Sequence, residues 1–289
     1  MALIFPKLHW ECQVELINDL QFNGSELIHF LLEHNNASLL YINKICNAAD
    51  VIASFIHYRN GTEKDVALYL ENCSNDSDFK EQLNLSLLKA SELGKTHCMS
   101  MLLKKGADPN SKIKGKSALH FAAESGSLPT VSLIVENNAD INAVDMDGWS
   151  PLMFASKTDN SRHIVKYLLD NRADINTQST TVDSHTALSI AISNCGLKVT
   201  HLLLSHGAKV DTTYRDSQKR SQLHYLLKSR EPLTKKMDLI LLLLQHNHPV
   251  DCEDKDGHDP LYLSTLTNDL ALVSLFLKYA PSNYNHEEL

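Results

Sequence analysis

Cysteine and histidine side chains are the residues of this sequence that could carry out covalent chemistry. A cysteine hydrolase needs a thiolate, a histidine that accepts its proton, and a carboxylate or amide that orients the histidine. The first part of the chain offers candidates for the first two roles, namely Cys12, Cys46, Cys73, His9, His29, His34 and His57. No local pattern marks any of these cysteines as activated. A small cysteine-dependent catalytic head in this region is therefore the alternative hypothesis for function.

The other reactive side chains predict neither a metal site nor a cofactor site. The six cysteines are so widely spaced that no CxxC pattern occurs, and we expect reduced thiols that pack as small apolar groups. Motifs of the HExxH, GxSxG, P-loop and GxGxxG types are missing from the sequence. His246, His248, Cys252 and His258 are close in sequence, but the repeat register described below separates them. We predict no catalytic residue, no cofactor and no metal ligand.

The elements that would position these side chains repeat along the chain. A motif centred on a leucine recurs at intervals of roughly 33 residues. Its leucines are Leu87, Leu119, Leu152, Leu188, Leu223 and Leu261. Each motif is followed by an apolar helical stripe, and three of these stripes end in Ala-Asp-x-Asn, at residues 107–110, 139–142 and 173–176. Two motifs that recur in register are far more specific than a single match.

This pattern resembles the ankyrin repeat, which starts with Thr-Pro-Leu-His-x-Ala, ends with Gly-Ala-Asp-x-Asn and has a period of about 33 residues. The match covers residues 80–284. The resemblance implies an all-α solenoid of helix–turn–helix units with short β-hairpins. His120 and His224 hold the repeat's own histidine position, which implies hydrogen bonds that brace adjacent hairpins.

Glycine positions agree with this arrangement. Gly94 and Gly126 are expected where a tight turn joins the two helices of a unit. Gly148 and Gly257 follow Asp-x-Asp sequences that have turn chemistry, so we place them at hairpin tips.

We divide the chain into three segments. Residues 1–80 lack the leucine motif and are expected to form a helical N-terminal cap, either two degenerate ankyrin-like repeats or an unrelated helical region. Residues 81–284 are expected to form about six repeats, of which the last acts as a cap. Residues 285–289 are expected to be a frayed tail.

The resemblance places contact positions on a concave face made of hairpin tips and the exposed sides of the first helices. The predicted protein-binding residues are Met146, Asp147, Trp149, Lys157, Asp183, His185, Asn194, Arg220 and Lys228. Trp149 is the strongest candidate because tryptophan is enriched at interface hot spots, and the alternative is that it packs on the neighbouring hairpin. The longer hairpins before Leu188 and Leu223 favour residues 146–230 as the contact region.

The amino-acid composition argues against nucleic acid and membranes as binding partners. The chain has 27 Lys and Arg against 35 Asp and Glu, a formal net charge of −8, which makes it a poor candidate for nucleic-acid binding. Its longest apolar run, at residues 239–244, is too short to cross a membrane, and the N-terminal residues do not have the pattern of a secretory signal. We therefore expect a cytoplasmic monomer that binds another protein without turnover.

Two further expectations concern modification and origin. Leu168, followed by Asp174, Ile175 and Asn176, resembles the pattern hydroxylated by the asparaginyl hydroxylase that acts on ankyrin repeats, so Asn176 is the expected substrate. Degenerate repeats of irregular length also resemble those of bacterial ankyrin-repeat effectors, which act in the host cytosol. In the alternative hypothesis, the array would target the catalytic head.

Overall fold

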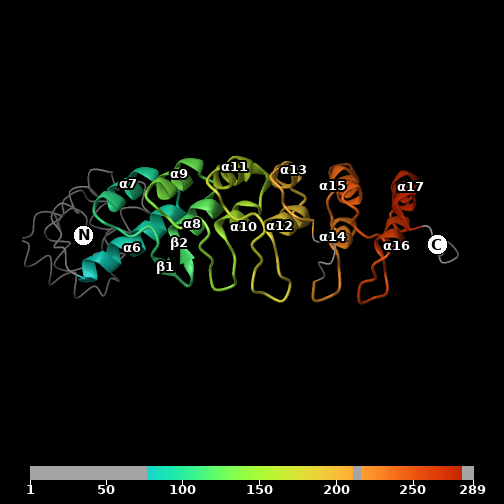
Figure 1. Ribbon diagram of the computed structural model, residues 1–289, viewed down its shortest axis with the longest axis horizontal. Coiled ribbons are helices and arrows are strands. Elements are labelled where there is room, and N and C mark those ends of the chain that lie inside the picture. The colour runs from blue at the N-terminus through green and yellow to red at the C-terminus, as the bar shows by residue number, and fades with distance from the viewer. Residues whose placement is uncertain (1–76, 211–215, 282–289) are drawn as a thin grey trace, which may run out of the picture. The chain divides into compact units, whose positions relative to one another are not determined.

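The computed structural model describes residues 77–210 and 216–281 (Figure 1). Nearly all of the expected N-terminal cap, with its candidate cysteines and histidines, and the expected tail lie outside these residues. The chain divides into two compact units, Met1–Asp140 and Ile141–Leu289. Each unit is described by itself.

The described part of the first unit contains two helix pairs and a hairpin. The helices are α6 (Ser77–Glu92), α7 (Thr96–Lys104), α8 (Ala118–Ser125) and α9 (Leu128–Glu136). Between the pairs, β1 (Lys112–Ile113) and β2 (Lys116–Ser117) are antiparallel, with Ile113 opposite Lys116. Helices α6 and α8 pack together, as do α7 and α9. The boundary predicted at residue 80 falls inside α6.

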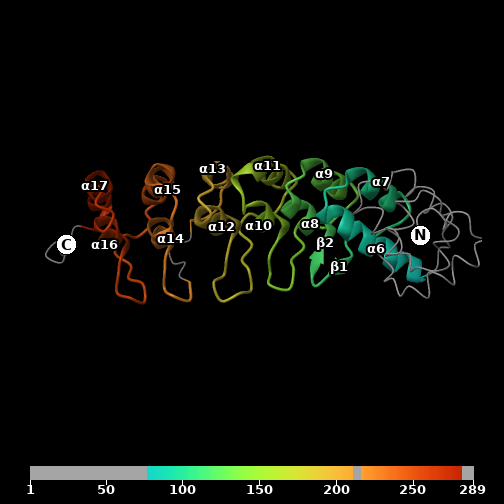
Figure 2. The same ribbon diagram turned by 180° about the vertical axis from the view of Figure 1, so that it is seen from behind.

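The described part of the second unit repeats this arrangement. Its first helices are α10 (Pro151–Ala155), α12 (Ala187–Ser193), α14 (Gln222–Lys228) and α16 (Pro260–Thr265). Its second helices are α11 (Arg162–Asp170), preceded by a 3-10 turn at Asp159–Ser161, α13 (Leu197–Ser205), α15 (Leu233–Gln245) and α17 (Leu270–Tyr279). Figures 1 and 2 show the second helices on one side, the first helices in the middle and the loops on the other side. The predicted paired-helix fold is confirmed.

Local sequence chemistry explains where the helices begin and turn. Ser150 caps α10, where its Oγ accepts from the backbone N–H of Met153 at 3.4 Å and Pro151 occupies the first turn. Thr186 caps α12 in the same way through Ser189. Gly94 and Gly126 have φ of +66° and +77° at the turns between paired helices, as predicted.

The core follows the leucine motif. The six motif leucines are all buried, and burying one such side chain contributes about 1.5–3 kcal/mol. Ala122, Ala123, Ala155 and Ala191 are also buried, and their small size lets neighbouring helices approach closely. Because every described first helix buries its motif leucine, the helix pairs stack within each unit.

Asparagine side chains tie the end of one repeat to the end of the next. In the first unit, the backbone N–H of Asp140 donates to Oδ1 of Asn110 at 2.7 Å. In the second unit, Asn142 accepts from Asp174 at 2.8 Å, and Asn176 accepts from Lys209 at 3.0 Å. The Ala-Asp-x-Asn motif therefore fixes the spacing of the loops that follow it.

Among the described residues, no helix combines the length and apolar character needed to cross a bilayer. Cys98, Cys195 and Cys252 are thiols rather than disulfides, and the first two are buried.

Candidate functional site

Three loops of the second unit are held by the same aspartate arrangement. Oδ1 of Asp145 accepts hydrogen bonds from the backbone N–H groups of Asp147 and Trp149, at 3.0 and 2.9 Å. Asp216 and Asp254 each accept from the residues two and four positions further along. Such a carboxylate fixes the loop backbone, so the residues at the loop tips are held in place.

Hydrogen bonds also link these three loops and the loop at residues 179–185 into a series in chain order. The donor and acceptor pairs are Thr180 N–H to Asp147 carbonyl at 2.9 Å, Ser217 N–H to Asp183 Oδ1 at 3.0 Å, and Lys255 N–H to Gln218 carbonyl at 3.0 Å. Gly148 is required at the first junction, because a Cβ there would lie 2.6 Å from the backbone nitrogen of Thr180. We call the loops at residues 144–149, 179–185, 216–220 and 254–258 the loop ridge.

Trp149 sits at the centre of an aromatic cluster on the loop ridge. Its ring centroid lies 5.4 Å from that of Phe154 and 6.0 Å from that of His185 on the neighbouring loop. Nζ of Lys157 lies 5.3 Å from the Trp149 centroid and 4.3 Å from the Phe154 centroid. Trp149 is half-buried: it contacts His185 of the neighbouring loop, and part of the residue remains exposed.

Arg220 takes part in a buried ionic network. Its Nε and Nη2 lie 2.8 and 2.7 Å from Oδ2 of Asp216, whose side chain is almost fully buried. The hydroxyl of Tyr225 donates to the same oxygen at 2.6 Å. Burial and the bond to Asp216 raise the pKa of Tyr225 to about 12. Burial alone would raise the pKa of Asp216, but the bonds from Tyr225 and Arg220 lower it.

Lys228 pairs with a buried aspartate, as Arg220 does. Its Nζ lies 2.5 Å from Oδ2 of Asp254 and 4.0 Å from Oδ2 of Asp256. Burial alone would raise the pKa of Asp254, but the bonds from Lys228 and from the backbone of His258 and Asp256 lower it to about 2. Arg220 and Lys228 therefore brace the loop ridge, and about a third of each side chain remains exposed.

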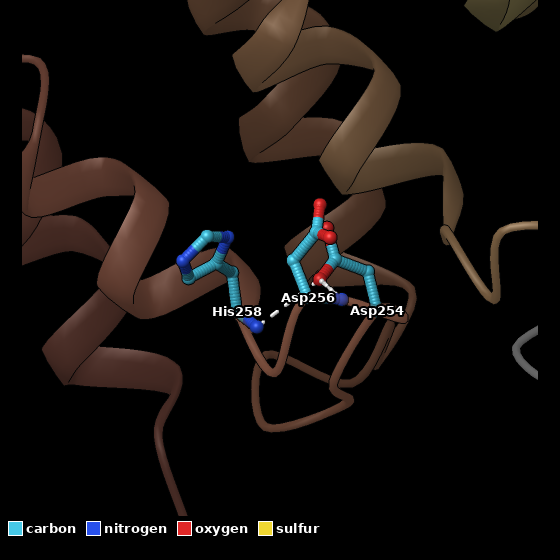
Figure 3. A group of neighbouring side chains, drawn as sticks. All are labelled: Asp254, Asp256 and His258. Atoms are coloured by element: carbon cyan, nitrogen blue, oxygen red, sulfur yellow. Dashed lines mark hydrogen bonds between the residues drawn. The ribbon is translucent and has the colours of Figure 1, made fainter.

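Asp254, Asp256 and His258 form a group with the chemistry of metal ligands (Figure 3). One potential ligand atom from each lies within 4.8 Å of the others. Both carboxylate oxygens of Asp254 are already engaged, one by two backbone N–H groups and the other by Lys228. The group therefore acts as a brace between α14 and the following loop.

His224 adds a hydrogen bond between α14 and the following loop. Nδ1 of His224 accepts from the backbone N–H of Ser221 at 3.1 Å, which assigns the proton to Nε2. Nε2 then donates to the carbonyl of His258 at 2.9 Å, and the His258 ring stacks on Tyr262 with centroids 4.9 Å apart. The predicted bracing of adjacent hairpins by His224 is confirmed. His120 uses Nδ1 to accept from Ser117 in the same way.

The predicted binding residues separate into two groups. Those engaged in contacts within the loop ridge or at its base are Trp149, Lys157, Asp183, His185, Arg220 and Lys228. Those exposed to solvent are Met146, Asp147 and Asn194, although the backbone of Asp147 is hydrogen-bonded to Asp145 and Thr180. Asn194 directly follows the end of α12, and its Nδ2–H donates a hydrogen bond to the carbonyl of Ile190 at 2.8 Å.

Two exposed apolar residues of the loop ridge were missed by sequence reasoning. Val182 is 87% exposed and Val144 is 40% exposed, beside the predicted Met146 at 78%. Val182 interrupts a polar loop, and this is the signal that could have identified it. The loop ridge thus presents apolar side chains on adjoining, braced loops.

Comparisons with known proteins agree with the repeat pattern. A family model described as ankyrin repeats in three copies matches residues 16–145, 87–179 and 143–214. Two putative ankyrin repeat proteins of fowlpox virus are 34% and 32% identical over 130 and 154 residues, which cover 45% and 51% of this chain and 18% and 45% of those proteins. Human ankyrin repeat and SOCS box protein 6 is 34% identical over 158 residues, covering 51% of this chain and 37% of that protein. The chain spans less than half the length of each of these curated relatives.

Proposed function

Because the chain belongs to the ankyrin-repeat family, we propose that it binds another protein, without catalytic turnover, through the loop ridge of its second unit. Ankyrin repeats imply a role in protein–protein interaction. The observation that carries the placement is the exposure of Met146 and Val182 on loops joined by the bond from Thr180 to Asp147. Loops that are already ordered lose little conformational entropy when a partner binds.

The surroundings of these two residues favour a protein partner of mixed chemistry. Apolar side chains at the centre with polar and charged groups around them are typical of the surface that a protein interface buries. Trp149 would contribute through its exposed part, and Asp147 and Asn194 would contribute polar contacts. We therefore place Met146, Val182 and Trp149 at the centre of the interface.

Site-specific photo-crosslinking tests this placement. A photoreactive amino acid is introduced at Met146 or at Val182 in the full chain, and at Leu266 as the control, because Leu266 is also apolar and 61% exposed but lies between α16 and α17. After irradiation in extract of the cells that make the protein, we expect a specific adduct, identified by mass spectrometry, at residues 146 and 182. Adducts formed only at residue 266, or at none of the three, would contradict the proposal.

We further propose that the chain acts as a monomer in the cytoplasm. Light scattering coupled to size-exclusion chromatography tests the first part, and cell fractionation tests the second. A role as a bacterial effector rests only on the irregular repeats, and the viral and animal relatives named above give it no support.

A further inference from the structure

The first unit contains a groove of about 420 Å³ between α6, the β1–β2 hairpin and α8. Apolar side chains line it from all three elements: Leu85 and Leu88 of α6, Ile113 of the hairpin and Phe121 of α8. We call it the hairpin groove. Its volume is in the range that suits a small ligand or a few side chains of a peptide.

The groove exists because α6 takes the place of a loop. Leu87 holds the motif position in α6 that Leu119 holds in α8. However, α8 begins directly before its leucine, at Ala118, whereas α6 begins at Ser77. The β1–β2 hairpin therefore lies against a helix (Figure 1), while the loops of the second unit lie against one another. The helical surface leaves apolar side chains facing the hairpin.

Lysines and glutamates lie at the edge of this apolar lining. Lys114 and Lys116 of the hairpin line the groove together with Lys89, against a single acidic side chain, Glu92. Lys89 pairs with Glu92 at 2.9 Å, and Lys116 lies 3.3 Å from Glu124. Lys114 is exposed at the hairpin turn. Three lysines against Glu92 and Glu124 thus give the groove and its edge one net positive charge, in a chain whose net charge is −8.

We propose that the hairpin groove binds an acidic segment of a partner protein that carries one apolar anchor residue. The anchor would pack against Leu88 and Phe121, and carboxylates of the segment would approach Lys114 and Lys116. The apolar lining favours a peptide over a bare anion, because burial of the anchor adds to the charge attraction. This inference rests on the proposed function of protein binding and adds a second site with a defined partner chemistry.

Selection of peptides on the full chain provides the probe. A random library of short linear peptides is selected against the immobilised protein, and the enriched peptides are labelled for fluorescence anisotropy. We expect enriched sequences that combine acidic residues with one large apolar residue, and binding that weakens as salt is raised. Failure to enrich any peptide, or enrichment of peptides without acidic residues, would overturn the proposal.

A matched pair of variants then locates the site. Lys114→Asn with Lys116→Gln removes two charges from the groove, and asparagine suits the positive φ of +50° at residue 114. Lys104→Gln with Lys105→Gln removes two charges from the exposed end of α7. We expect roughly tenfold weaker binding for the first pair and less than about twofold change for the second. Ile113→Ser, at a side chain 41% exposed, tests the apolar part with little risk to folding. Circular dichroism melting confirms that each variant is folded.

Further results distinguish binding at the hairpin groove from binding at the loop ridge. Equal affinity of the two charge variants would overturn the hairpin groove. Peptides whose binding is lost with Met146→Ser and Val182→Ser, but not with the lysine variant, would overturn the groove and leave the loop ridge supported. Self-association of the chain that requires Lys114 and Lys116 would identify a second copy as the occupant and would also overturn the proposal.

Discussion

Nζ of Lys228 at the end of α14 lies 2.5 Å from Oδ2 of Asp254, a carboxylate whose side chain is only 2% exposed. The two residues are 26 positions apart in sequence, and their contact ties a first helix to the loop of the next repeat. Because the other oxygen of Asp254 accepts two backbone N–H groups, loss of the lysine would leave a buried, hydrogen-bonded carboxylate without its cation.

Replacing this lysine should therefore destabilise the second unit. We expect Lys228→Met to lower the free energy of unfolding by about 1–2 kcal/mol. This loss is smaller than for a fully buried ion pair, because water reaches about a third of the lysine side chain and weakens the interaction. Lys235→Met is the control, since its pair with Glu231 is exposed on both sides and such surface pairs contribute little to stability. Urea denaturation measures both. Equal stability losses for the two variants would show that the buried pair has no special role.

The same carboxylate predicts a pH dependence. The pKa of Asp254 is lowered from 3.8 to about 2 in the folded protein. A lowered pKa means that the folded state binds the proton less readily, so this contribution is present above pH 4 and is lost as the pH falls toward 2. It amounts to about 2 kcal/mol for this group. Urea denaturation from pH 7 to pH 2.5 should show a smaller acid-induced loss for Asp254→Asn than for the unaltered chain. Parallel curves would contradict the assignment.

Gly148 provides a test of how closely the loops approach. Its φ is +75°, and a Cβ there would lie 2.6 Å from the backbone nitrogen of Thr180. We expect Gly148→Ala to cost about 1–3 kcal/mol through backbone strain and displacement of the neighbouring loop. Gly257→Ala has a similar φ of +79° but no atom within 4 Å, so it isolates the strain alone. Thermal melting that is equal for the two variants would mean that the loops do not need this close approach.

Asn176 should be hydroxylated if the protein meets the asparaginyl hydroxylase of a eukaryotic cytosol. Its side chain is near the surface, where Oδ1 accepts from the backbone N–H of Lys209 at 3.0 Å. Mass spectrometry after incubation with that enzyme should find one added oxygen on the peptide that contains Asn176, and less on the peptide that contains Asn110, whose motif carries a proline. An unmodified Asn176 peptide would dispose of this prediction.

The features that could be predicted from the sequence are those that recur at fixed positions in the repeat. The motif leucines and the turn glycines at residues 94 and 126 depend on spacing within one repeat, which a sequence displays directly, and His224 was identified by its position in the repeat. The pairing of Lys228 with Asp254 and the contact of Trp149 with His185 depend on how far one loop leans on the next. That distance is set by three-dimensional packing, so the sequence did not indicate that Trp149, Arg220 and Lys228 also brace the loops.

The hairpin groove was missed for a related reason. Residues before position 80 carry no leucine motif, so nothing indicated that α6 would begin at Ser77 and replace a loop. Val182 was missed because the repeat pattern indicates contact positions near a hairpin glycine, and the loop at residues 179–185 has no glycine.

The most direct test of the central claim uses the partner that photo-crosslinking identifies. The partner is purified, and isothermal titration calorimetry measures its affinity for two double variants of this chain. Met146→Ser with Val182→Ser removes apolar surface from the loop ridge, and Leu266→Ser with Leu270→Ser removes comparably exposed leucines from the α16–α17 region. We predict that the first variant binds the partner at least about tenfold more weakly, which corresponds to about 1.4 kcal/mol, and that the second binds it normally. Unchanged affinity of the Met146 and Val182 variant, with its fold intact, would contradict the proposal that the loop ridge binds the partner.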